Sequence, residues 1–108
     1  MRPNSRLSAA IIAALVALPA THTEAEELRG KALVETNCAR CHAVGSNDTS
    51  THPDAPPFRT LSKRYPIEDL EEALAEGIST GHPDMPEFVA SPDQIDAIIA
   101  YIRSVQDR

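Results

Sequence analysis

The chain has 108 residues, of which 10 are lysine or arginine and 16 are aspartate or glutamate, so its net charge is −6 at pH 7. This length holds one domain, and the acidic balance argues against nucleic acid as a partner, because phosphate binding needs basic side chains gathered on one face. Only two cysteines are present, too few to supply the four ligands of a structural zinc site.

The first residues have the features of a secretory signal. Arg2 and Arg6 form a short basic region, and the apolar run 7–18 is too short to cross a bilayer as a helix of the mature protein. Small residues follow, and cleavage fits after Ala20 or after Ala25. We therefore expect a signal peptide here, with an uncleaved anchor as the alternative.

With the signal assigned to residues 1–25, the domain covers residues 26–108 and is expected to be exported, without stable membrane insertion. Loss of residues 1–20 removes two arginines and no acidic residue, so the net charge changes from −6 to −8. The remaining chain has little apolar material for a core, and domains of this size rely on disulfides, metals or cofactors. Its aromatic residues are Phe58, Tyr65, Phe88 and Tyr101. We expect a cofactor to complete the core.

A first helix is predicted over residues 26–37, with acidic residues at its start and the apolar residues Leu28, Leu33 and Val34 along it. It would bring Cys38 to its C-terminal end. Gly30 lies in its middle, where glycine costs about 1 kcal/mol relative to alanine. Close contact with another backbone or a bulky ring, for which Tyr101 is the candidate, would explain this glycine.

Two cysteines and a histidine follow this helix with the spacing of a haem attachment motif, Cys38-Ala39-Arg40-Cys41-His42. Each thiol can add across one haem vinyl group to form a thioether, and the adjacent His42 is then held under the iron as an axial ligand. A thioredoxin-like redox pair would need a longer βαβ context, which the chain lacks. The motif therefore predicts covalent haem.

Helices and proline-rich loops account for the rest of the chain. Residues 43–57 read as a loop that wraps one side of the site, and Pro66 fits the first position of a middle helix that Gly77 ends. Between them, a group of polar residues can meet the haem propionates or form a solvated basic patch. These residues are Arg59, Lys63, Arg64 and Tyr65.

The last helix has a well-defined start. Ser91 is the expected N-cap, Pro92 the first helical residue and Gln94 the reciprocal capping side chain. Apolar residues at spacings of three and four then form one stripe that must be buried. They are Ile95, Ile98, Ile99, Ile102 and Val105.

On these residues the chain resembles small bacterial class I c-type cytochromes, which carry one haem and are made with a secretion signal. The resemblance implies an all-α cytochrome c fold, with three main helices and loops wrapped around one covalently bound haem c. In that family a glycine of the first helix meets an aromatic residue of the last, and Gly30 and Tyr101 occupy those places. A proline carbonyl accepts a hydrogen bond from the axial histidine, which implies Pro56 here, with Pro57 as the alternative.

The loop over residues 81–88 resembles the methionine loop of that family, which implies Met85 as the second axial ligand. Met85 is the only methionine left after signal removal, and Pro83 and Pro86 stiffen the backbone around it. His82 is the rival ligand and His52 a more remote one. A methionine that only fills a gap in the core is the remaining interpretation.

Two filled axial positions leave the iron no open site for a substrate, so the expected role is electron transfer and the chain is not expected to be an enzyme. We expect a monomeric carrier that moves single electrons between periplasmic redox proteins, from a dehydrogenase donor to an oxidase or reductase acceptor. Two alternatives remain. One is a dedicated cytochrome c subunit of a periplasmic dehydrogenase complex, and the other is a ligand-binding or peroxidatic haem protein with a labile sixth position.

Overall fold

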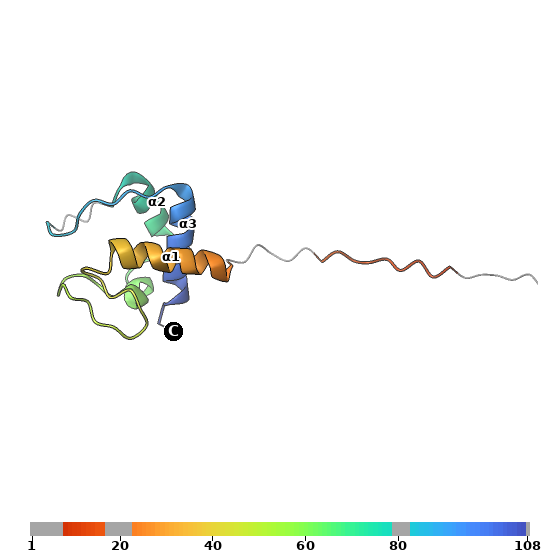
Figure 1. Ribbon diagram of the computed structural model, residues 1–108, viewed down its shortest axis with the longest axis horizontal. Helices are drawn as coiled ribbons and strands as arrows, with labels where there is room; N and C mark the ends of the chain where they lie inside the picture. Colours follow the sequence, from red (N-terminus) through yellow and green to blue (C-terminus); the bar gives the residue numbers. More distant parts are fainter. Residues whose placement is uncertain (1–7, 17–22, 79–82, 108) are drawn as a thin grey trace, which may run out of the picture.

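The computed structural model describes residues 8–16, 23–78 and 83–107. Its elements are three α-helices and one short 3-10 helix, namely α1 (Glu24–Asn37), η1 (Phe58–Lys63), α2 (Asp69–Glu76) and α3 (Pro92–Ser104). The described residues contain no strand. In Figure 1, α1 crosses α3, α2 lies beside α3, and the loop between α1 and η1 extends to one side of the helices. The predicted all-α architecture is confirmed.

The first helix begins two residues earlier than predicted. Thr23 is its N-cap, and the Thr23 hydroxyl accepts a hydrogen bond from the Glu26 backbone N–H at 3.1 Å. Acidic side chains in the first turn stabilise the helix, because they lie near the positive, N-terminal end of its dipole. The buried side of α1 is narrow, because Val34 is 0% exposed whereas Leu28 is 59% exposed.

Backbone contact between α1 and α3 explains Gly30. A Cβ atom at this position would lie 1.8 Å from the Ala97 carbonyl oxygen and 2.8 Å from the Tyr101 Cβ. No side chain can be accommodated at such distances. The sequence-based expectation that Gly30 meets a backbone and Tyr101 is therefore confirmed.

The capping of α3 also agrees with the sequence. The Ser91 hydroxyl accepts from the Gln94 N–H, the Gln94 side chain accepts from the Ser91 N–H, and Pro92 is the first helical residue. Four residues of the predicted apolar stripe, Ile95, Ile98, Ile99 and Ile102, are buried in the core, and Val105 is partly buried against it. The buried residues of α3 are Ile95, Ala97, Ile98, Ile99, Ala100, Tyr101 and Ile102.

The middle of the chain differs from the prediction in two ways. Pro66 does not start α2: residues 66–68 form a turn, with the Asp69 N–H bonded to the Pro66 carbonyl at 3.1 Å, and the helix begins at Asp69. The turn buries Ile67, which is 5% exposed. The second difference is η1, which the periodicity of the sequence did not indicate. Gly77 ends α2 as expected, with a φ of 92°.

Residues 8–16, which carry most of the apolar N-terminal run, form neither helix nor strand. Their large apolar side chains are exposed. Across the parts of the chain that the structure describes, no helix is long and apolar enough to cross a membrane. The basic residues Arg2 and Arg6 and the possible cleavage position after Ala20 lie outside the described residues.

Candidate cofactor site

The end of α1 positions both cysteines and His42. The Cys38 N–H donates to the Val34 carbonyl at 2.8 Å, and the N–H groups of Cys41 and His42 both donate to the Cys38 carbonyl, at 3.2 and 2.9 Å. The chain therefore coils tightly after the helix. This coil places all three motif side chains along one cavity.

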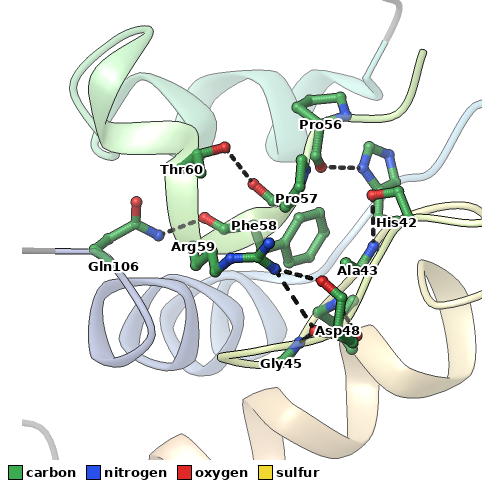
Figure 2. A network of polar contacts seen from close by, with 12 residues as sticks. His42, Ala43, Gly45, Asp48, Pro56, Pro57, Phe58, Arg59, Thr60 and Gln106 are labelled. Carbon is green, nitrogen blue, oxygen red and sulfur yellow. Dashed lines mark hydrogen bonds and ion pairs between the residues drawn. The ribbon is translucent and has the colours of Figure 1, made fainter. Parts of the chain in front are cut away.

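A carbonyl oxygen fixes the orientation of the His42 ring. Nδ1 of His42 donates a hydrogen bond to the Pro56 carbonyl at 2.9 Å, whereas the Pro57 carbonyl accepts from the Thr60 hydroxyl at 2.9 Å (Figure 2). With the ring proton on Nδ1, Nε2 keeps its lone pair and is the nitrogen able to bind a metal. The Phe58 ring lies beside the imidazole, with 5.0 Å between the ring centroids.

The loop after the motif is closed by its own side chains. The Asp48 carboxylate accepts from the N–H groups of Val44 and Gly45 at 3.1 and 2.9 Å, and the Arg59 guanidinium donates to the Asp48 carbonyl at 2.6 Å (Figure 2). The Tyr101 hydroxyl donates to the Val44 carbonyl at 2.6 Å, and burial raises the pKa of this phenol. We call residues 38–58, which hold His42 in this way, the histidine side.

The basic group between the loop and α2 does not gather at the cavity. Arg59 is engaged by Asp48, and the Lys63 ammonium lies 3.8 Å from the Asp107 carboxylate. Arg64 is exposed and does not line the cavity. Of the four residues that the sequence suggested for the propionates, Tyr65 alone lines the cavity.

The cavity itself has a volume of about 790 Å³, a size typical of pockets that enclose a ligand. Polar groups lie at the motif and at the opposite loop, and the wall between them is apolar. Side chains of η1, α2 and α3 form this wall, and they are Phe58, Leu61, Leu70, Leu74, Ile98 and Ile102. The sequence marked the α3 residues as buried, and the structure shows that two of them, Ile98 and Ile102, face the cavity.

Met85 lines the same cavity from the loop between α2 and α3 and is half-buried. The base of this loop is closed by two backbone hydrogen bonds, from the Ile78 N–H to the Phe88 carbonyl at 3.2 Å and from the Ala90 N–H to the Leu74 carbonyl at 3.1 Å. We call residues 77–90 the methionine side, of which the structure describes 77–78 and 83–90.

The two rival ligands are placed differently. His82 lies outside the described residues. His52 lines the cavity, but its Nδ1 accepts from the Asp54 N–H and its Nε2 is bonded to the Asp84 carboxylate, both at 3.1 Å. Both ring nitrogens of His52 are therefore engaged in this arrangement.

The donor set fits a covalently bound haem. Cys38 and Cys41 are free thiols rather than a disulfide, and an imidazole nitrogen and a thioether line the same apolar cavity. Burial raises the pKa of the Cys38 thiol to about 11, so this group is protonated at neutral pH. Addition of a protonated thiol across a vinyl group leaves a neutral thioether, which suits an apolar wall.

Comparison with known protein families identifies one family. The family model described as Cytochrome c matches residues 28–106, a range that runs from α1 to the residues after α3. Comparisons with curated proteins and with solved structures give no match.

Proposed function

The chain belongs to the cytochrome c family, and on that premise we propose that it is an exported periplasmic protein that carries single electrons on one haem c bound by His42 and Met85. The family carries covalently attached haem c, and the two cysteines fit its attachment motif. A haem-based electron-transfer role follows from the family. When bound, the haem supplies an iron that alternates between the ferrous and ferric states.

One observation carries the proposed ligand pair: His42 and Met85 line the same cavity from different segments of the chain. The hydrogen bond to Pro56 directs the lone pair of His42 Nε2 away from the carbonyl. A methionine that bound the iron together with a histidine would raise its reduction potential relative to two histidines. The apolar wall excludes water, so that little solvent must reorganise when the charge of the site changes.

The surface of the domain supports a free carrier rather than a permanent subunit. Large apolar residues that are exposed within the described part of the domain are Leu28 and Val89, which belong to different elements. Single exposed apolar residues are normal on monomeric proteins, whereas an obligate interface needs a large contiguous patch. We therefore favour a monomer that meets its partners briefly.

The partners we propose are periplasmic redox proteins, a dehydrogenase as donor and an oxidase or reductase as acceptor. Net charge is −6 for the whole chain, so long-range attraction favours a basic partner surface, and association should slow as salt rises. The proposed contact is the edge of the cavity, near Arg40 and Pro86. Stopped-flow rates against a basic and an acidic redox partner test this. Salt-dependent slowing only with the acidic partner would contradict it.

Ligation by Met85 is tested in the ferric holo-protein. Sulfur bound to ferric haem gives a weak near-infrared charge-transfer band, which we expect in the wild type and expect Met85→Ala to abolish while lowering the reduction potential. His82→Ala is the matched control in the same loop and should leave the band intact. A wild type without the band, together with a spectrum that changes in His82→Ala, would instead assign the sixth position to histidine.

A further inference from the structure

A hydrogen bond joins the histidine side to the methionine side. Nε2 of His52 lies 3.1 Å from Oδ2 of Asp84, although the two residues are 32 positions apart in the chain. Both residues line the cavity. Asp84 directly precedes Met85 in the sequence, so this contact lies next to the proposed sixth ligand.

His52 is held firmly on its own side. Its backbone N–H donates to the Cys41 carbonyl at 3.2 Å, and its carbonyl accepts from the Ala55 N–H at 3.1 Å. The ring nitrogen Nδ1 accepts from the Asp54 N–H at 3.1 Å. With Nδ1 acting as an acceptor, the ring proton is on Nε2, which therefore donates to Asp84. The backbone of His52 is thus tied directly to the haem attachment motif.

Asp84 is the less constrained partner. Its side chain is 67% exposed, whereas that of His52 is 25% exposed. Prolines flank this part of the loop, since Pro83 precedes Asp84 and Pro86 follows Met85, and each fixes its own φ. A restraint on Asp84 therefore restricts the position of Met85 as well.

We propose that His52 is a positioning residue for the sixth-ligand loop: it holds Asp84, and through it Met85, over the cavity, and so protects the iron from external ligands. This inference rests on the proposed ligation by Met85. An external ligand can reach the iron only when the thioether leaves, and departure of the thioether requires the loop to move. Loss of the tether should raise the population of the open loop, and hence the apparent affinity for the competitor.

Imidazole titration of the ferric holo-protein tests the tether, with loss of the near-infrared band as the signal. We expect His52→Ala and Asp84→Ala each to raise the affinity for imidazole about threefold, the effect of removing a well-exposed pair. The double variant should show no larger increase in imidazole affinity than either single variant, because each single variant already removes the same contact. Asp84→Asn keeps an acceptor oxygen for Nε2 and should restore an affinity near that of the wild type.

Lys31→Ala is the matched control, because it breaks an exposed pair with Glu35 on α1 that does not line the cavity. It should leave imidazole binding unchanged. Asp84→Ala alters an exposed side chain and decides the question even if His52→Ala fails to fold. Wild-type affinity in Asp84→Ala, or additive effects in the double variant, would overturn the inference while the wild-type band still supports ligation by Met85. A wild type without the band would overturn both.

Discussion

The histidine side and the methionine side hold their proposed ligands by different means. On the histidine side, the end of α1, the Asp48 carboxylate and the Pro56 carbonyl fix successive residues through hydrogen bonds, and two thiols are available for covalent attachment. On the methionine side, the bond from the Ile78 N–H to the Phe88 carbonyl closes the loop on itself. Among the described residues, the Ala90 N–H bonds to the Leu74 carbonyl of α2, and Asp84, next to Met85, bonds to His52. One ligand is thus part of a rigid network, and the other is on a loop held at a few points.

The largest difference between the two sides should be in retention of the cofactor. We expect Cys41→Ser to keep at most one thioether, and the double variant Cys38→Ser with Cys41→Ser to lose all haem on acid-acetone extraction. Met85→Ala, the control on the methionine side, should keep its haem because no covalent bond is removed. Intact-mass measurement separates these cases, and haem that is extracted from the wild type would contradict covalent attachment.

Gly30→Ala should destabilise the whole domain, because the new Cβ would lie 1.8 Å from the Ala97 carbonyl oxygen. We expect the free energy of unfolding to fall by about 3 kcal/mol, the upper part of the range for overpacking. Denaturant unfolding of the holo-protein measures this. The neighbouring exposed variant Lys31→Ala should change the value by less than about 0.5 kcal/mol. An unchanged stability in Gly30→Ala would mean that the two helices can separate without cost.

Gly77→Ala should act on the methionine side. Gly77 has a φ of 92°, and a Cβ there would lie 2.6 Å from the Glu87 carboxylate. We expect a loss of about 2 kcal/mol from backbone strain, together with a weaker near-infrared band. Combining it with Glu87→Ala removes the contact but not the strain, so most of the loss should remain. Full recovery in the double variant would show instead that the side-chain contact was the cause.

Thr23→Ala should give the smallest loss of stability among these variants. It serves as a reference, because Thr23 belongs to neither the histidine side nor the methionine side. Loss of the N-cap hydrogen bond to Glu26 should lower the free energy of unfolding by about 1 kcal/mol, with no change in the near-infrared band. A change in that band would show that the start of α1 is coupled to the methionine side.

The same cap bears on processing of the chain. Cleavage after Ala25 would remove the N-cap Thr23 and the first two residues of α1, Glu24 and Ala25, whereas cleavage after Ala20 retains them. We therefore expect N-terminal sequencing of the mature protein to begin at Thr21. A product that begins at Glu26 would contradict this, and one that still begins at Met1 would contradict export with signal removal.

Local patterns in the sequence were sufficient for the attachment motif at the end of α1 and, apart from the first two residues of α1, for the two long helices. The sequence alone indicated these features because each has a signature within a few residues. The signatures are the capping residues of α3, the glycine in the middle of α1 and the spacing of the motif at its end. The start of α2 was wrong because Pro66 is compatible with a turn as well as with a first helical turn. That choice depends on burial of Ile67, which is a tertiary effect.

Contacts between distant loops could not be read in this way. His52 was considered only as a remote ligand, because a histidine and an aspartate that are 32 residues apart carry no mutual signal in one sequence. The wall formed by η1 was missed because six residues are too few to show a helical period. Likewise, the role of Arg59, which lies in η1, depends on Asp48 in the preceding loop.

The element that completes the core is also the last to be made. Seven of the fifteen buried apolar residues that the structure describes belong to α3. A chain that is synthesised from its N-terminus therefore presents Cys38 and Cys41 before α3 can pack against α1. The order of the elements along the chain thus places both cysteines in the part that is made before the core can close.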